Sequence, residues 1–126
     1  MAKVNVVKYI GVFLISAVFL LTVCISNVSA SDCESILENN IGWTIIDSKT
    51  IEGWKDTDEQ KEDGFEGCNY GRVIYFTDGT QVECSCYGYQ YAYRPTAIIL
   101  GRNFGFKGKT YTAYKMIVED EEYDIR

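Results

Sequence analysis

Residues 72–87 read RVIYFTDGTQVECSCY and hold the clearest structural signal in the chain. Two runs rich in β-branched and aromatic residues flank Asp78-Gly79, which is the pattern of a β-hairpin. A two-residue turn would scatter the apolar side chains over both faces of the hairpin, whereas a three-residue loop over 77–79 gathers them on one face. We therefore predict the three-residue loop, which places four side chains together: Ile74, Phe76, Val82 and Cys84.

On the N-terminal side of the hairpin, residues 31–40 are predicted to form a short helix. Ser31 and Glu34 make a capping box, and apolar residues follow at helical spacing. Residues 43–54 are rich in β-branched and aromatic side chains, which predicts a first strand. Residues 55–67 are polar and charged, so we expect a long surface loop there.

On the C-terminal side, Pro95 interrupts the pattern and residues 96–100 resume it as a strand. Residues 101–108 are predicted to be a glycine-rich turn, and the last strands are expected at 111–118 and 123–125. Short strands with too few residues between them for crossover helices predict an antiparallel sheet. The expected fold class is mainly β: a small antiparallel barrel or sandwich, with an SH3-like barrel favoured, and one short N-terminal helix after a signal peptide.

The first thirty residues have the three-part layout of a secretory signal peptide. A basic start is followed by an apolar run over 9–25 and then by small or polar residues. Val28 and Ala30 occupy the small-residue positions that signal peptidase reads, so we predict cleavage after Ala30. An uncleaved membrane anchor is the second interpretation. We thus expect a signal peptide over 1–30 and a single small β domain over 31–126.

Four of the five cysteines follow the predicted cleavage site: Cys33, Cys68, Cys84 and Cys86. An even number of cysteines in a small exported domain is typical of a disulfide framework. Residues two apart in a strand lie near the roughly 7 Å Cα limit for a bridge, so Cys84 and Cys86 should have different partners. The hairpin register favours Cys68 with Cys86 and Cys33 with Cys84, and it leaves the reverse assignment open.

The composition argues against several kinds of function. Once Lys3 and Lys8 leave with the signal, 10 Lys and Arg remain against 18 Asp and Glu, a net charge of −8. This balance argues against nucleic acid or an anionic membrane surface as a partner. The chain has no histidine, which removes the usual general base and the usual zinc ligand. Cys84-Ser85-Cys86 also lacks the spacing of redox and zinc motifs, so we expect no metal and no cofactor.

The acidic loop over 56–63 suggests a calcium site, because alternate carboxylates can converge on a hard cation. Counted from Asp56, however, the sixth and twelfth positions are Lys61 and Gly67, where an EF-hand needs Gly and Glu. We interpret these carboxylates as solvated. A small periplasmic hydrolase that uses carboxylates and tyrosines is the alternative to a non-catalytic binding or structural module.

Residues 87–95, YGYQYAYRP, are the feature of the sequence that differs most from an ordinary strand. In an extended strand the four tyrosine rings would share the face opposite Cys84 and Cys86, and Tyr75 would join them from the neighbouring strand. A small domain needs aromatic residues in its core, so a core role is the first interpretation of the four tyrosines. Buried hydroxyl groups need partners, which favours an exposed surface for a sugar or a protein. The candidate binding residues are Tyr87, Tyr89, Tyr91, Tyr93 and, at the edge, Arg94.

Several segments resemble a group of small exported bacterial proteins, mostly from proteobacteria, that have no assigned function. The similar segments are 65–68, 71–74 with Asp78-Gly79, 89–95 and 116–125, and together the similarity covers most of the chain after residue 30. The resemblance implies a bacterial source and a periplasmic location, with secretion into the medium as the second interpretation. It implies no activity, ligand or catalytic residue.

Overall fold

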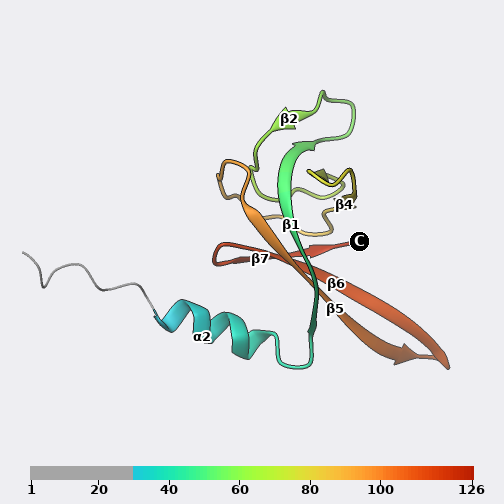
Figure 1. Ribbon diagram of the computed structural model, residues 1–126. Coiled ribbons are helices and arrows are strands. Elements are labelled where there is room, and N and C mark those ends of the chain that lie inside the picture. The colour runs from blue at the N-terminus through green and yellow to red at the C-terminus, as the bar shows by residue number, and fades with distance from the viewer. Residues whose placement is uncertain (1–29) are drawn as a thin grey trace, which may run out of the picture. The chain divides into compact units, whose positions relative to one another are not determined.

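A computed structural model describes residues 30–126 (Figure 1). The predicted signal peptide lies outside the described residues, apart from Ala30, and stays a prediction. The described chain begins with one helix, α2 (Ala30–Asn39), and continues in seven strands. The strands are β1 (Thr44–Lys55), β2 (Glu62–Asp63), β3 (Val73–Phe76), β4 (Gln81–Glu83), β5 (Thr96–Phe106), β6 (Lys109–Val118) and β7 (Glu121–Ile125). The prediction of a mainly β domain with one short helix is confirmed.

The strands form one antiparallel sheet in the order β4-β3-β1-β5-β6-β7, with β2 paired to β1. The sheet curls into a half-barrel. Its long strand β1 takes part in both halves: residues 44–50 pair with β5, and residues 51–55 pair with β3. The short strand β2 adds to the second half of β1 through Gly53 and Trp54. The two halves of the sheet therefore share one strand.

The predicted hairpin is present, with its three-residue loop. Val73 pairs with Glu83 and Tyr75 with Gln81, so residues 77–79 form the loop between β3 and β4. The amide of Gly79 donates to the carbonyl of Phe76, which closes the turn. The second strand ends at Glu83 rather than continuing to residue 87, because the chain there turns to hydrogen-bond with the C-terminal strand β7 and Arg126.

The core lies on the inner face of the curled sheet. The four side chains predicted to lie together, Ile74, Phe76, Val82 and Cys84, all belong to it or pack against it. The helix α2 contributes little, since Leu37 is mostly exposed. Asn40 attaches the end of the helix to the sheet by donating from Nδ2 to Glu122 Oε1 at 2.6 Å. No helix in the described part of the chain is long and apolar enough to cross a membrane.

The prediction of a glycine-rich turn over 101–108 is wrong. Strands β5 and β6 continue through this segment and pair as far as Phe106 with Lys109. Only Lys107 and Gly108 form the turn, with φ of 50° and 73°. These values match the two-residue hairpin turn in which both residues have positive φ. The glycines at 101 and 105 are strand residues, because their backbones pair in register with Tyr114 and Thr110.

The preferred disulfide pairing is also wrong. Cys68 is bonded to Cys84, with the two Cα atoms 5.6 Å apart, whereas Cys33 and Cys86 are free. Cys68 and Cys84 both lie in the core, and their bond is one half of the reverse assignment; its other half, Cys33 with Cys86, is not formed. Cys33 lies exposed on α2, whereas Cys86 is half-buried and packs against the core near Asp124, and the two are not bonded.

Candidate functional site

The candidate site is the tyrosine strip, which we define as Tyr87, Tyr89, Tyr91 and Tyr93. Its segment lies outside the named strands, between β4 and β5, and isolated bridges at Gly88 and Ala92 pair it with Cys68 and Phe65. Odd positions from 85 to 93 are exposed, and even positions from 84 to 92 are buried or half-buried. The four tyrosines are 72%, 71%, 68% and 70% exposed. The alternation predicted for a strand is therefore present, and the rings point away from the core.

Backbone hydrogen bonds hold the strip from behind. Gly88 and Cys68 exchange two bonds of 2.8 and 3.0 Å, and Ala92 and Phe65 exchange two of 2.9 and 3.0 Å. The Cys68–Cys84 disulfide joins the same two segments. Because every inward position is either hydrogen-bonded or packed, the segment can present its outward side chains without belonging to a regular strand.

Two glycines make this close approach possible. Gly67 has φ +75°, and a Cβ there would lie 2.0 Å from the carbonyl oxygen of Gly88. A Cβ on Gly88 would lie 3.0 Å from Cε1 of Tyr123. Glycine at 67 and 88 thus has a structural reason, since the close approach of the two backbones and of Tyr123 leaves little room for a side chain at either position.

A polar contact fixes the middle of the strip. Gln90 Oε1 accepts the hydroxyl proton of buried Tyr123 at 3.0 Å, and Gln90 Nε2 donates to Glu119 at 3.0 Å. The Tyr123 ring also packs edge-on against Phe65, with centroids 5.5 Å apart. Burial, followed by the nearby carboxylates, raises the pKa of Tyr123 to about 12. This tyrosine is therefore a structural residue with a satisfied hydroxyl group.

Arg94 lies at the end of the strip, as predicted. Its Nη2 lies 3.2 Å from Asp63 Oδ1, and its guanidinium lies 5.8 Å from the Tyr93 ring centroid. The charge of Asp63 raises the pKa of Arg94, so the guanidinium stays charged. One ion pair engages only part of the five-donor fork, which leaves donors for a ligand beside Tyr93.

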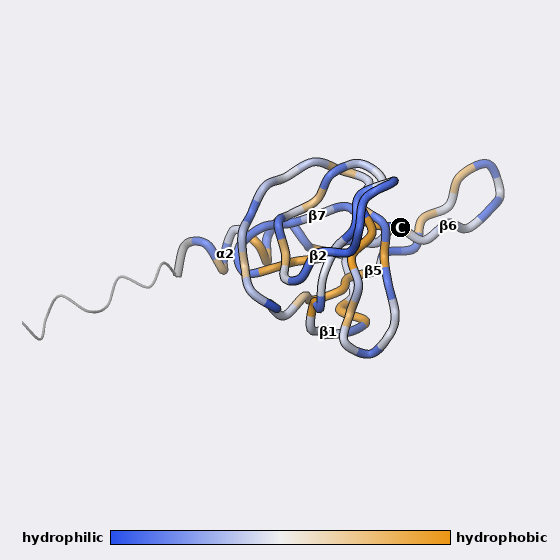
Figure 2. The backbone as a smooth tube through the Cα atoms, turned by 90° about the horizontal axis from the view of Figure 1, so that it is seen from above, coloured by the Kyte–Doolittle hydropathy of each residue, from blue (hydrophilic) through white to orange (hydrophobic). Residues whose placement is uncertain are grey.

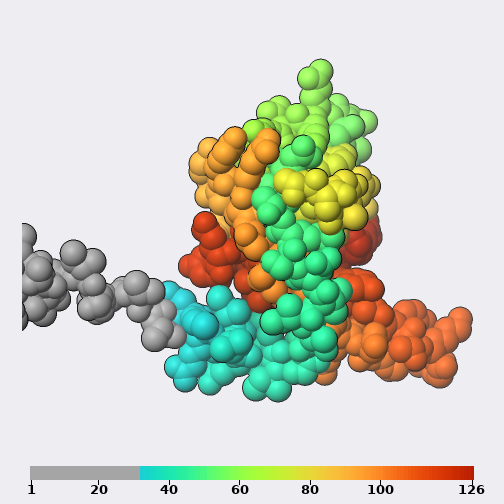
Figure 3. Space-filling view, in the orientation of Figure 1, coloured from blue at the N-terminus to red at the C-terminus, as the bar shows by residue number. Residues whose placement is uncertain are grey.

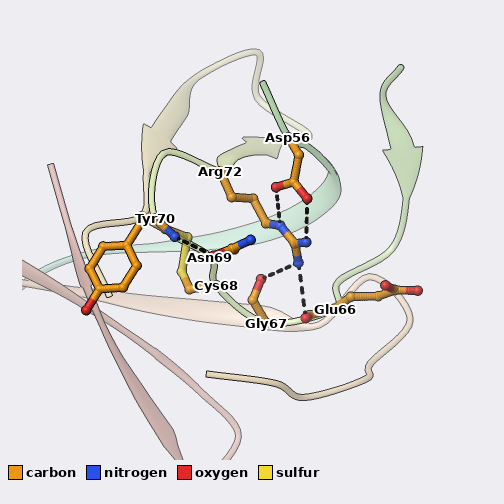
Figure 4. A network of polar contacts seen from close by, with 8 residues as sticks. Asp56, Glu66, Gly67, Cys68, Asn69, Tyr70 and Arg72 are labelled. Atoms are coloured by element: carbon orange, nitrogen blue, oxygen red, sulfur yellow. Dashed lines mark hydrogen bonds and ion pairs between the residues drawn. A yellow bond between two sulfur atoms is a disulfide. The ribbon is translucent and has the colours of Figure 1, made fainter. Parts of the chain in front are cut away.

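Sequence reasoning missed the residue that organises the loop behind the strip. Arg72 is buried and binds both carboxylate oxygens of Asp56, at 2.7 and 2.8 Å (Figure 4). Its Nη1 also donates to the carbonyls of Glu66 and Gly67, each at 3.2 Å. The guanidinium lies 3.8 Å from the Trp54 ring centroid. Arg72 therefore fixes the 66–67 backbone, and with it the partner segment of the strip.

Asp56 in the acidic loop was expected to be solvated, but its carboxylate is bound to Arg72. Hydrogen bonds from Arg72 lower the pKa of Asp56, so the carboxylate is ionised and engaged. No group of three or more carboxylates, cysteines or histidines in residues 30–126 is arranged to hold a metal ion. No motif links Asp56 to Arg72, which lie 16 positions apart, so their contact depends on the fold.

Two further tyrosines, Tyr70 and Tyr75, differ in their exposure. Tyr70 is 73% exposed, and the sequence analysis did not include it among the candidate binding residues. Cys68 is hydrogen-bonded to Gly88, and Gly71 to Cys84, so Tyr70 lies beside the start of the strip. Tyr75 was expected to join the strip. It is half-buried instead and lies under the Lys61 ammonium, 4.9 Å from the ring centroid.

Two hollows lie elsewhere in the described part of the chain. The larger, of about 590 Å³, is lined at the junction of β1, β5 and β6 by Ile46, Arg102 and Tyr114, among others, and by no carboxylate. The smaller, of about 380 Å³, contains Asp32, Asp120, Glu121 and Glu122. Lys115 and Asn40 already engage the Glu122 carboxylate there. The smaller hollow is the only one of the two that fits the hydrolase alternative.

The fold and the site together define a small, mainly β domain with an outward row of tyrosines and one disulfide behind it. Comparisons with protein-family models, curated proteins and solved structures found no match to this chain. The resemblance to exported proteobacterial proteins stays a prediction.

Proposed function

We propose that the chain is an exported, non-catalytic binding module, and that the tyrosine strip binds an extended saccharide. The observation on which this rests is the exposure of all four rings, each close to 70%. Exposed rings contribute little to the core, and a group of large exposed apolar side chains is typical of an interaction site. A disulfide and the absence of a spanning helix in residues 30–126 are compatible with export to the periplasm or the medium.

The geometry of the strip favours a linear ligand. Four rings at two-residue spacing form a row of roughly 20 Å in extended backbone. No ring of the strip stacks on another aromatic ring in the described part of the chain, and each ring is close to 70% exposed. Sugar rings offer apolar C–H faces to aromatic rings and hydroxyl groups to the tyrosine and Arg94 donors. A saccharide chain therefore matches both the apolar and the polar groups of the row.

The proposal is tested by co-sedimentation with insoluble cellulose, chitin and peptidoglycan sacculi. We expect the protein to sediment with at least one of them, and the Tyr89→Ala/Tyr91→Ala variant to bind about 30-fold more weakly, since each lost ring contact is worth roughly 1 kcal/mol. The matched control is Phe104→Ala/Tyr111→Ala, which removes two exposed rings from another surface and should bind normally. Binding to none of the three polymers, or equal binding by the strip variant, would contradict the proposal.

A further inference from the structure

A second surface, independent of the tyrosine strip, is the arm, which we define as residues 102–113. These residues pair only with each other, from Arg102 opposite Ala113 to Phe106 opposite Lys109. Pairing of β1 with β5 ends at Gly101, and pairing of β7 with β6 ends at Tyr114. The arm projects from the rest of the sheet as a two-stranded ribbon (Figures 1 and 3).

The two faces of the arm differ in chemistry. Strand alternation places Arg102, Phe104, Phe106, Lys109 and Tyr111 on one face. Small or polar residues occupy the other: Asn103, Gly105, Thr110 and Thr112. The Phe104 and Tyr111 rings stack with centroids 5.7 Å apart, and both remain 47% and 43% exposed. One face of the arm is therefore aromatic and basic, and nothing in residues 30–126 covers it.

The arm also concentrates positive charge in an acidic protein. Residues 84–118 contain no Asp or Glu, and they contain Arg94, Arg102, Lys107, Lys109 and Lys115. The ion pairs found within residues 30–126 do not include Arg102, Lys107 or Lys109. Lys107 instead lies over the Phe106 ring, 5.2 Å from its centroid. In Figure 2 the end of the arm beside the β6 label extends away from the rest of the chain. Lys107 and Lys109 thus lie toward the tip of the arm with the exposed rings, whereas Arg102 lies at its base.

The length of the arm separates these cations from the acidic residues. The five paired residues from Arg102 to Phe106 extend roughly 14 Å. At physiological salt, electrostatic interactions are screened over about 8 Å. A partner at the tip would therefore experience the positive charge of the arm and little of the negative charge of the body. The net charge of the whole chain argues against an anionic surface as partner, but the local charge of the tip argues for one.

We propose that the tip of the arm docks on an anionic phospholipid bilayer. Phe104, Phe106 and Tyr111 would enter the headgroup region, and Lys107 and Lys109 would contact lipid phosphates. A narrow convex ribbon needs a deformable partner, and a lipid interface adapts to such a tip where a folded protein surface would need a matching groove. The unpaired backbone edges of the arm confine it to the wet interface, because hydrocarbon would leave them without hydrogen bonds.

Flotation with vesicles tests this docking. The protein used is residues 31–126, since residues 32–126 form one compact unit that contains the whole described core. Vesicles of phosphatidylcholine are compared with vesicles that contain about one-third phosphatidylglycerol. We expect binding to the anionic vesicles only, weakening as salt rises. Lys107→Gln/Lys109→Gln should bind on the order of 30-fold more weakly, and Phe104→Ser/Phe106→Ser at least roughly tenfold more weakly.

Two controls make the result specific. Tyr89→Ala/Tyr91→Ala should bind vesicles like the parent, so failure of the docking and failure of the saccharide proposal can be distinguished. In Phe106→Trp, vesicles should shift the additional tryptophan emission to shorter wavelength, as expected for entry into the interface. No binding to anionic vesicles at low salt, or equal binding by the arm variants, overturns the proposal. Arm-dependent self-association in sedimentation equilibrium without vesicle binding also overturns it and points to a second copy as the partner.

Discussion

At the scale of single residues, Gly67 and Gly79 provide a matched pair. Both have positive φ, +75° and +83°, so alanine is strained at either position. A Cβ at Gly79 would meet nothing within 4 Å, whereas one at Gly67 would lie 2.0 Å from the Gly88 carbonyl oxygen. The difference between the two substitutions therefore measures the close backbone crossing behind the tyrosine strip.

We expect Gly67→Ala to lower the free energy of unfolding by about 3 to 5 kcal/mol, because strain adds to the loss of the hydrogen bonds between Cys68 and Gly88. Gly79→Ala should cost only about 1 to 2 kcal/mol. Urea denaturation of the two variants measures both values. Equal losses of unfolding free energy in the two variants would show that the backbone at Gly67 can move away from Gly88 without weakening these hydrogen bonds.

The tyrosine strip was predictable residue by residue, because period-two alternation is a property of any extended chain. Its exposure was not, since a sequence gives the face of a ring but not what lies opposite that face. Arg72 was missed for a related reason. Its partner Asp56 is 16 positions away along the chain, and only the return of the loop against Trp54 brings the two together.

At the scale of structural elements, the Cys68–Cys84 disulfide joins the hairpin to the loop behind the strip. Its sequence separation is 16 residues, and closing a loop of that size contributes roughly 3 kcal/mol. We expect Cys68→Ala/Cys84→Ala to lose about that much stability in urea denaturation. Cys33→Ala changes an exposed free cysteine and should stay within about 0.5 kcal/mol of the parent. A double variant as stable as Cys33→Ala would contradict the expectation.

The hairpin and the arm show where element prediction succeeds and fails. The loop over 77–79 was predictable because only one register gathers the apolar side chains on a buried face. The arm has no buried face, since every residue from 102 to 112 is exposed. Without that constraint, the glycines at 101, 105 and 108 led to the prediction of a glycine-rich turn, although only Gly108 lies in a turn. The preferred disulfide failed similarly, because it relied on extending a strand that ends at Glu83.

At the scale of the whole molecule, acid should destabilise the fold. The pKa of Asp56 is lowered by Arg72, and that of Asp47 is lowered by Lys49. A lowered pKa stabilises the folded state above the unfolded value of about 3.9, and this contribution is lost as pH falls through the folded pKa. We expect the thermal midpoint to fall steadily below about pH 4. In Asp56→Asn the decline should be shallower, and an unchanged slope would exclude Asp56 as a source.

Alkali should act through Tyr123. Its pKa of about 12 exceeds the unfolded value near 10, so the stabilisation is complete below pH 10 and lost between pH 10 and 12. We expect a loss of up to about 2 kcal/mol over that interval, measured by urea denaturation at each pH. Tyr123→Phe cannot ionise and should show a weaker dependence. A parent protein whose stability is flat from pH 10 to 12 would contradict the assignment.

The shared strand β1 has a consequence for how the molecule loses its structure. Strands β2 to β4 depend on the second half of β1, and strands β5 to β7 depend on its first half. Fraying of β1 at its centre would deprive both groups of their pairing partner at once, so neither group forms a separate cooperative unit. The domain should therefore melt in a single all-or-none transition, with the slowest hydrogen exchange at the central amides of β1 and the fastest in the arm.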